Sequence, residues 1–478
     1  MTARNLMILW VLAAMVWFSG WALWNSHSGQ QSESSDAGFA LSFPRGSVPW
    51  SEVDRVEVSR GAGSGFAFER RDGRWFQRAP FEFPVESTSI AALLECASAL
   101  TSREVPVSDS ERTALLDSVG LRDDAPFVKF SWQDGAVQIG LGARLPAGFA
   151  WVETEGQPGI ARSTLHDAAL LSDIRQWRHT LLFSRADVDC QRLICESAAR
   201  DGTRQRLEVV RSGSSWSVIS PFKTRADRTA IERWLEALAR AQASGFVVDQ
   251  PLDLLPFGLH APSAVVEIHA TTRKSGTDGR VIVEPSVERL EIGAPIRPQA
   301  AERFARLANH PETIIEIDGT AVAAAVPQSL LMVDPTATGL RPEDVGAIRI
   351  EPTGGESVRM ERSGGAWNIT DASGSHPAQG AAVEGLLSKL CAVRATDIML
   401  TAVPGDLVIG RIALESFDER EIATLTISRE GNEGRFGIDD GSGVLRVFPA
   451  SLSLQLDRAA YASDPSASGA APPNSVQR

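Results

Sequence analysis

The sequence has 478 residues, of which 43% are hydrophobic and 22% are charged, and it carries a formal net charge of -13. This composition supplies enough apolar side chains for folded cores and excludes a chain that is disordered throughout. The acidic balance argues against a nucleic-acid-binding protein, because phosphate contacts require clustered lysine and arginine, whereas here the arginines are scattered among acidic residues.

The first element in chain order is an uncharged apolar run, Leu6–Trp24, interrupted only by Ser19 and Gly20. At about 1.5 Å per residue, a helix of this length comes close to crossing the roughly 30 Å hydrocarbon core of a bilayer. The run is longer than the apolar region of a secretory signal peptide. The sequence therefore favours an uncleaved transmembrane anchor at residues 6–24 over a signal that is removed.

The charges that flank this run predict its orientation. Arg4 precedes the run, and no lysine or arginine follows it before Arg45. The positive-inside rule then places residues 1–5 in the cytoplasm and the body of the chain outside. In a bacterium this protein would be a single-pass protein of the inner (cytoplasmic) membrane with a periplasmic body. The polar residues 25–47, rich in serine and glutamine, predict a flexible linker.

Beyond the linker, three stretches of sequence repeat one order of elements. Each has two alternating strands, a glycine turn that leads into tryptophan, an amphipathic helix and further strands. In the first stretch, Val56 and Val58 alternate with polar residues, which is typical of an antiparallel strand with one buried face. The three turns read Gly73-Arg74-Trp75, Gly213-Ser214-Ser215-Trp216 and Gly365-Ala366-Trp367.

The helices give the closest internal match. Apolar residues recur at i, i+3, i+4, i+7 and i+10 in all three, which is the stripe that a helix needs to cover a sheet. The stripes are Ile90, Leu93, Leu94, Ala97 and Leu100; Ile231, Trp234, Leu235, Leu238 and Ala241; and Val383, Leu386, Leu387, Leu390 and Val393.

Further strands are predicted after each helix. A Gly-Leu step precedes them at Gly120-Leu121 and Gly258-Leu259, whereas in the third stretch Ile409-Gly410 lies too early to be its equivalent. The next strands are Phe127–Trp132, Val265–Ile268 and Leu425–Ile427, and the ones after them end in Ile139-Gly140, Ile292-Gly293 and Phe436-Gly437.

These patterns predict an α+β fold of three tandem repeats of antiparallel sheet covered by helices, behind one N-terminal transmembrane helix. The expected repeats are residues 48–183, 184–338 and 339–462, and the Pro/Ala/Ser-rich residues 463–478 predict a disordered tail. The repeat is too long for a solenoid unit of about 20–50 residues, so tandem domains or interlocked lobes are expected. Whether the third repeat is a complete domain stays open.

The layout resembles the bacterial family known as domain of unknown function 4340. The likeness rests on the N-terminal anchor, the opening Val53–Val58, the glycine-to-tryptophan turn with its helix, and the Gly-Leu step that runs from Gly120 to Pro126. It covers roughly residues 48–462. The resemblance implies a single-pass envelope protein, of which some relatives are auxiliary parts of gliding-motility-type ABC transport systems. It supplies no catalytic residues to carry over.

No residue set commits the chain to a reaction, so we predict no catalytic residues, no cofactor and no metal. The sequence lacks a phosphate-binding P-loop and a Gly-x-Ser-x-Gly nucleophile turn. The segment Gly61–Gly65 joins two alternating strands, and Asp439–Gly443 lacks the later glutamate of a calcium loop, so both are predicted hairpin turns. The seven histidines are dispersed, which favours surface or hydrogen-bonded histidine over metal ligation.

Four cysteines are too few and too spread for a disulfide framework, and no Cys-x-x-Cys spacing is present. Cys190 and Cys195 would lie about 17 Å apart on one extended strand, so they can bridge only if a turn folds them together. Buried free thiols are favoured for Cys96, Cys190, Cys195 and Cys391, and the disulfide state of the close pair stays open.

The tryptophans are the remaining candidates for a binding surface. Trp75, Trp216 and Trp367 stand at equivalent positions, which favours a core role that closes sheet against helix. Trp50, Trp132 and Trp151 occur in one repeat only and are better candidates for ligand contact.

The favoured function is that of a non-enzymatic accessory or scaffold protein, an auxiliary part of an ABC-type transport or surface-assembly system that contacts a membrane or envelope complex. A second hypothesis is an extracytoplasmic module that binds cell-wall glycan or an exported substrate. A third is an envelope hydrolase whose site is assembled between repeats. The partner, the ligand and the oligomeric state are left open by the sequence.

Overall fold

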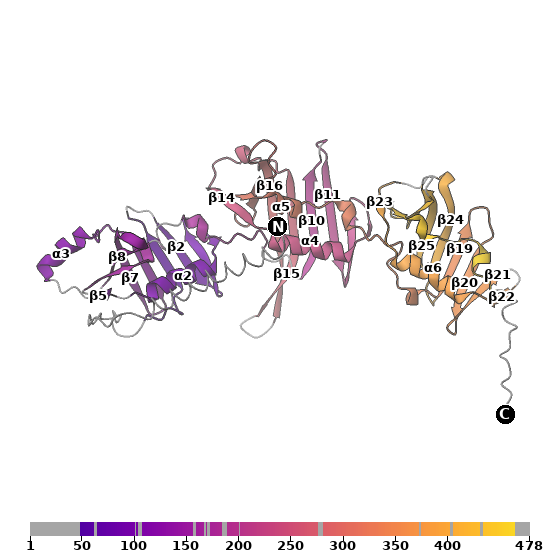
Figure 1. The fold of residues 1–478 in the computed structure, drawn as a ribbon, viewed down its shortest axis with the longest axis horizontal. Helices are drawn as coiled ribbons and strands as arrows, with labels where there is room; N and C mark the ends of the chain where they lie inside the picture. The colour runs from indigo at the N-terminus through magenta and orange to yellow at the C-terminus, as the bar shows by residue number, and fades with distance from the viewer. Residues whose placement is uncertain are drawn as a thin grey trace, which may run out of the picture. The chain divides into compact units, whose positions relative to one another are not determined.

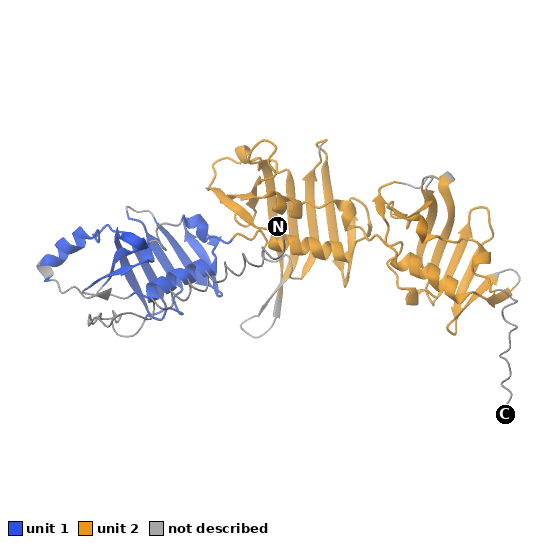
Figure 2. Ribbon diagram, viewed as in Figure 1, with its two compact units in different colours: residues 1–179 blue, residues 180–478 orange. Residues whose placement is uncertain are grey.

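The computed structural model describes residues 48–61, 65–100, 102–103, 108–155, 159–166, 169, 173–183, 189–199, 201–275, 281–371, 374–401, 405–430 and 434–463. Contacts divide the chain into two compact units, residues 1–179 and 180–478, and each is described by itself (Figure 2). The predicted anchor at residues 6–24, the linker at 25–47 and nearly all of the predicted tail lie outside the described residues.

Three antiparallel sheets of nine strands each make up the described chain (Figure 1). The first, in unit 1, contains β1 (Arg55–Ser59), β2 (Gly65–Arg71), β3 (Arg74–Ala79), β4 (Phe83–Pro84), β5 (Ser102–Arg103), β6 (Phe127–Trp132), β7 (Gly135–Arg144), β8 (Ala150–Thr154) and β9 (Ile160–Ser163). The second, in unit 2, contains β10 (Cys190–Ala198), β11 (Arg204–Ser212), β12 (Ser215–Ser220), β13 (Thr224–Arg225), β14 (Ala243–Asp249), β15 (Ala264–Ser275), β16 (Val281–Pro295), β17 (Arg303–Leu307) and β18 (Thr313–Ile317). The third, also in unit 2, contains β19 (Ala347–Pro352), β20 (Val358–Ser363), β21 (Ala366–Asp371), β22 (Gly374–Pro377), β23 (Asp397–Met399), β24 (Val408–Glu415), β25 (Glu421–Glu430), β26 (Arg435–Asp439) and β27 (Leu445–Phe448).

The strand order is the same in all three sheets. The sheets read β4-β3-β2-β1-β6-β7-β8-β9-β5, then β13-β12-β11-β10-β15-β16-β17-β18-β14, then β22-β21-β20-β19-β24-β25-β26-β27-β23. In each sheet the fourth strand of the repeat forms one edge, and the fifth strand forms the opposite edge. The chain therefore crosses the sheet between these two strands. The prediction of an α+β fold with three repeated antiparallel sheets is confirmed.

The crossing segment in each repeat is the predicted amphipathic helix. These helices are α2 (Ser87–Ser98), α4 (Arg228–Arg240) and α6 (Gly380–Ala392), and Figure 1 shows each of them lying across the strands of its own sheet. The buried residues fall on the predicted stripes: Ile90, Leu93 and Ala97; Ile231, Trp234 and Leu238; Val383, Leu386, Leu387 and Leu390. The structure also contains helices α3 (Asp109–Ser118) and α5 (Gly319–Ala325).

The core of each repeat lies between the sheet and this helix. In the first repeat, Val56 pairs with Phe68 on one side and Phe130 on the other, and all three side chains are fully buried. The alternation seen in the sequence therefore places one side of each strand in the core. Trp75, Trp216 and Trp367 are buried as well, with 6%, 7% and 3% of their surface exposed, so their predicted core role is confirmed.

Each repeat is closed by a residue that follows its last strand. The closing residues are Trp177, Met332 and Tyr461, which end or follow the short 3-10 helices Ile174–Trp177, Ser329–Met332 and Arg458–Ala460. Their carbonyl oxygens accept hydrogen bonds from Glu86, Asp227 and Gln379, the residues at the N-terminal caps of α2, α4 and α6, at 2.7–2.8 Å. The same hydrogen bond thus ties the end of each repeat to the start of its helix.

One part of the strand alignment in the third repeat is wrong. Leu425–Ile427 was expected to match Phe127–Trp132 and Val265–Ile268, yet it lies in β25, which corresponds to β7 and β16. The equivalent strand is β24, which starts directly after the 3-10 helix Gly405–Leu407. Phe436-Gly437 is likewise displaced by one strand, in β26. Successive antiparallel strands show the same alternation of apolar and polar residues. Without a Gly-Leu step in the third repeat, the sequence does not show which of these strands comes first after the helix.

The Gly-Leu step has a structural role in the first two repeats, where it lies against β7 and β16, the third strand after the repeat helix. Gly258 has a φ of 65°, and a Cβ atom at Gly293 in β16 would lie 2.1 Å from the carbonyl oxygen of Phe257. Leu259 follows the step and is buried. Glycine is therefore required on both sides of this contact.

We expect Gly293→Ala to lower the free energy of unfolding by about 1–3 kcal/mol, because the added methyl group meets backbone that must move. The matched control is Gly385→Ala in α6, where nothing lies within 4 Å of the added atom. That change should raise stability by roughly 0.5–1 kcal/mol, since alanine favours the helix. Urea unfolding measures the change in the free energy of unfolding for both variants. Equal changes in the two variants would contradict the close backbone approach at Gly293.

Among the described residues, no helix combines the length and the apolar character needed to cross a bilayer.

Candidate functional site

Within the part of the chain that the structure describes, the sequence candidates for catalysis or metal binding lie apart from one another. Asp439–Gly443 forms the turn between β26 and β27, and Gly61 and Gly65 flank the turn between β1 and β2, as predicted for both. His269 lies 3.1 Å from Glu267, and His179 lies 3.7 Å from Glu86. Within the described residues, no group of three metal-ligating side chains occurs.

The tryptophans that occur in one repeat only are half-buried against the first repeat. Trp50 meets the ring of Phe130 edge-on at 5.2 Å between ring centres, and Trp151 lies under the guanidinium of Arg162 at 5.2 Å. Trp132 packs over Gly135, where an added Cβ atom would lie 2.8 Å from the indole. Protein atoms therefore cover part of each indole, which weakens the hypothesis of a sugar-stacking surface at these residues.

The four cysteines are free thiols. Cys190 and Cys195 are both buried on β10, and burial raises the pKa of Cys190 to about 11 and that of Cys195 to about 12. Cys96 and Cys391 are half-buried on α2 and α6. The extended strand keeps the close pair unbridged, because five successive residues of a strand span about 17 Å.

We expect iodoacetamide to modify Cys96 and Cys391 of the folded protein well before Cys190 and Cys195. Alkylation requires a thiolate and access, and the buried pair offers neither near neutral pH. Peptide mass spectrometry after timed labelling measures the order, with urea-unfolded protein as the control in which all four react. Because the folded pKa values lie above the ordinary value of 9.0, ionisation of this pair favours unfolding as the pH rises from about 9 through about 12.

A cluster of buried charges joins the second and third sheets inside unit 2. Arg446 on β27 is fully buried, and its guanidinium donates to the carbonyl oxygen of Asp334 at 2.8 Å and to Oγ1 of Thr224 at 3.0 Å. Its Nη1 atom lies 3.2 Å from Oδ2 of Asp440. Thr224 belongs to the edge strand β13, so Arg446 links the third sheet to the edge of the second.

Asp440 is shared between two arginines of this cluster. Its Oδ2 atom also accepts from Nη1 of Arg225 at 3.1 Å, and Arg225 donates in turn to Asp334 at 3.2 Å. Burial alone would raise the pKa of Asp440, but the charge of Arg446, the hydroxyl of Ser442 and the charge of Arg225 outweigh burial and lower it. The turn that sequence reasoning read only as a hairpin therefore supplies the carboxylate of the junction.

A second ion pair crosses the same junction. Asp227 caps α4 by accepting from the backbone of Thr229 and Ala230, and its other oxygen accepts from Nη2 of Arg394 at 2.6 Å. Arg394 follows α6, so the pair connects the start of one repeat helix to the end of the next. A pocket of about 290 Å³ lies beside it and is lined by Asp227, Asp334, Thr336, Thr338 and Cys391, among others.

A groove runs between the repeat helix and the closing segment in both repeats of unit 2. We call the first the α4 groove: its volume is about 420 Å³, and α4 contributes Ala230, Arg233, Trp234 and Ala237. The opposite wall comes from α5 and the closing segment, through Ala323, Ala324, Pro327, Leu331 and Met332. The ion pair of Asp227 and Arg394 lies at the junction end.

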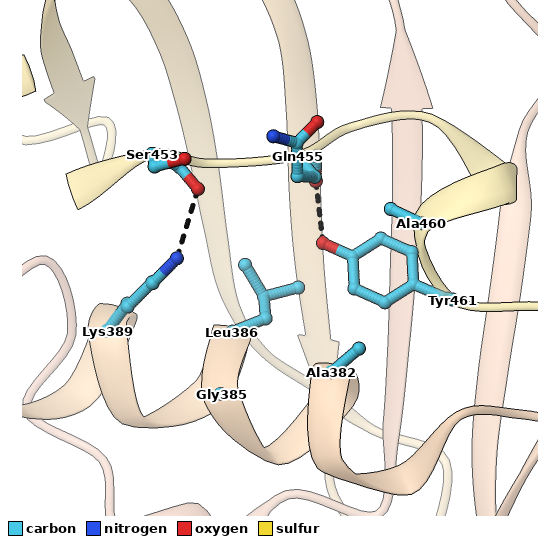
Figure 3. Close-up of a pocket in the computed structure, with 8 residues that line it drawn as sticks. All are labelled: Ala382, Gly385, Leu386, Lys389, Ser453, Gln455, Ala460 and Tyr461. Atoms are coloured by element: carbon cyan, nitrogen blue, oxygen red, sulfur yellow. Dashed lines mark hydrogen bonds between the residues drawn. The ribbon is translucent and has the colours of Figure 1, made fainter. Parts of the chain in front are cut away.

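The α6 groove occupies the equivalent place in the third repeat and is smaller, at about 200 Å³ (Figure 3). Its helix residues Ala382, Gly385, Leu386 and Lys389 stand at the same helix positions as the four from α4. Figure 3 shows Lys389 and Tyr461 reaching the segment beyond the helix, where Lys389 donates to the carbonyl of Ser453 at 3.0 Å and Tyr461 to that of Gln455 at 2.6 Å. These two side chains narrow the α6 groove.

Sequence reasoning missed both the grooves and the junction. One signal was visible: Arg446 interrupts the apolar strand Leu445–Phe448, and a charged residue there requires a buried partner. No charged or polar residue in the sequence marks the grooves. They form where small residues, alanine or glycine, lie beside the buried stripe of an amphipathic helix.

The comparison with protein families gives one match. The model of the family described as "Domain of unknown function (DUF4340)" matches residues 216–407. This range starts in β12, ends in the 3-10 helix Gly405–Leu407, and includes α4, α5, α6 and the strands from β13 to β23. The resemblance expected from the sequence is thereby confirmed for this part of the chain. No significant match was found among curated proteins or among solved structures.

Proposed function

We propose that this protein is a membrane-anchored, extracytoplasmic accessory or scaffold protein, and that it serves as an auxiliary part of an ABC-type transport or surface-assembly system. One observation carries the proposal: the same sheet-and-helix repeat occurs three times, and the last two copies are joined by buried ion pairs into one unit. Repetition of a module, with two copies linked by ion pairs, suits a protein that holds several partners.

Further support comes from the sequence and from the family resemblance. The apolar residues 6–24 and the charges around them favour an anchor with the body outside the cytoplasm. The resemblance to the domain of unknown function adds support, because members of that family look like single-pass envelope proteins. The glycan-binding alternative has less support, since Trp50, Trp132 and Trp151 pack against their own repeat.

The test is purification of the tagged full-length chain from its native membrane in a mild detergent. A matched chain in which a cleavable secretion signal replaces residues 1–24 serves as the comparison. We expect the anchored chain to retain membrane proteins, including a permease and its ATPase, in constant proportion, and the released chain to lose them. Recovery of the anchored chain alone, or its retention on purified peptidoglycan with no membrane protein attached, would count against the scaffold role.

A further inference from the structure

We propose that the α4 groove binds an acidic segment of a partner protein, which places an aliphatic side chain on the groove floor and a carboxylate beside Arg233. The inference rests on the scaffold function proposed above and names the chemistry of the partner. Three features of the groove carry it: an apolar floor, small residues that leave room above the floor, and a positive rim.

The floor of the groove is apolar although it contains an indole. Trp234 donates its Nε1 hydrogen to the carbonyl oxygen of Ala324 at 2.9 Å, so the polar atom of the ring is already satisfied within the repeat. Met332 and Pro327 extend the apolar surface, and Leu331 is 63% exposed at the rim. An aliphatic side chain that enters the groove gains burial at the floor without displacing a hydrogen bond.

The room above the floor comes from alanines on both walls. Ala230 and Ala237 on α4 face Ala323 and Ala324 on α5, and the resulting volume of about 420 Å³ is roughly twice that of the α6 groove. In the α6 groove, Lys389 stands where α4 has Ala237, and it is held across the opening by Ser453. The α4 groove is thus the open member of an equivalent pair.

The charge of the rim selects an acidic occupant. The neighbouring arginines of α4 are paired on the helix surface, Arg228 with Glu232 and Arg240 with Glu236, whereas no carboxylate of the described residues pairs with Arg233. Arg394 is positive too, but Asp227 offsets it. The lining therefore carries one uncompensated positive charge, that of Arg233, in a chain whose formal charge is -13, and this charge favours a carboxylate of the bound segment at the rim.

The test uses the full-length protein in detergent and a short fluorescent helical peptide of leucine, alanine and glutamate as the probe. Matched peptides replace glutamate by lysine, or leucine by serine. We expect fluorescence anisotropy to show binding of the first peptide alone among the three. Arg233→Glu and Ala237→Trp should each weaken that binding by roughly tenfold or more, through reversed charge and through a filled groove. Arg233 is exposed and Ala237 is half-buried, so circular dichroism and urea unfolding of both variants must match the wild type before their affinities are compared.

The control variant is Arg240→Glu, which changes the net charge equally but lies outside the groove lining. It should leave the affinity within about twofold of the wild type, well under one tenfold step. Equal loss in Arg240→Glu and Arg233→Glu would overturn the proposal, because the attraction would then be unspecific. Equal binding of the glutamate and lysine peptides would overturn it too. Concentration-dependent dimers that disappear in Ala237→Trp would identify a second copy as the occupant, against the proposal.

Purification of the Ala237→Trp variant from native membrane separates this inference from the scaffold proposal. If the wild type retains membrane partners and the variant retains them equally, the groove proposal fails and the scaffold role stands. If the wild type retains none while the glutamate peptide still binds in the groove, the scaffold role fails and the groove assignment stands.

Discussion

Replacing Asp440 by asparagine is expected to destabilise unit 2 by about 3–5 kcal/mol, because it removes the carboxylate that offsets the fully buried Arg446. Arg225 would lose the same partner and would stand as a second positive charge near Arg446. Urea unfolding measures the loss, and hydrogen exchange should rise in the linker around Asp334 and Thr336, which the two arginines hold through backbone carbonyls.

Two further variants make this result specific. Asp418→Asn removes an exposed carboxylate that pairs with Arg420, and solvent screens a surface pair of this kind, so the change should leave stability nearly unaltered. The double variant Asp440→Asn with Arg446→Met should recover much of the lost stability, since it removes the stranded charge together with its partner. If Asp440→Asn and Asp418→Asn unfold alike, the buried cluster does not stabilise the junction.

Acid should reproduce the effect of Asp440→Asn. The pKa of Asp440 in the folded protein lies below its ordinary value of 3.8, since neighbouring cations and Ser442 outweigh burial. The stabilisation from its carboxylate is therefore complete above about pH 4 and is lost as the pH falls through the folded pKa. The difference in stability between wild type and variant should shrink over that interval.

Leu387→Ala is expected to lower the free energy of unfolding by about 2–5 kcal/mol, because the side chain is fully buried between α6 and the third sheet and its removal leaves a cavity. Leu331→Ala in the same unit is the matched control. That side chain is 63% exposed at the rim of the α4 groove, so its truncation should change stability by less than about 0.5 kcal/mol.

The two leucine variants also separate fold from function. Thermal unfolding gives the stability difference, and anisotropy with the glutamate peptide gives the affinity. We expect Leu387→Ala to lower the stability and Leu331→Ala to lower the affinity for the glutamate peptide. A large stability loss in Leu331→Ala would contradict its place at a solvent-exposed rim.

The parts of the fold that the sequence predicts well are those set by periodicity. Val56 and Val58 alternate because one face of β1 enters the core, and the stripe through Ile231, Trp234 and Leu238 follows one face of α4. Both patterns are local, so they can be read without knowledge of the fold. The equivalence of Trp75, Trp216 and Trp367 follows from the same regularity and extends it across the three repeats.

The features that the sequence does not predict depend on residues far apart in the chain. Asp440 and Arg225 are more than two hundred residues apart, and their pairing follows from how the second sheet meets the turn between β26 and β27. The α4 groove is likewise lined by alanines of two separate helices, α4 and α5. The identity of an alanine does not show which residue lies across the groove from it. The misalignment of strands in the third repeat has the same origin. Alternation shows which side chains of a strand face the core, but it does not show which strand pairs with it.

The position of the closing residues has a consequence for synthesis. Trp177 is synthesised before β10, the first strand of the second repeat. Met332 is likewise synthesised before β19, the first strand of the third repeat. Among the described residues, every sheet is built from strands of its own repeat, so each module can complete its core before the next one is synthesised. Synthesis from the N-terminal end would then complete the modules one at a time, with little opportunity for strands to pair between wrong copies.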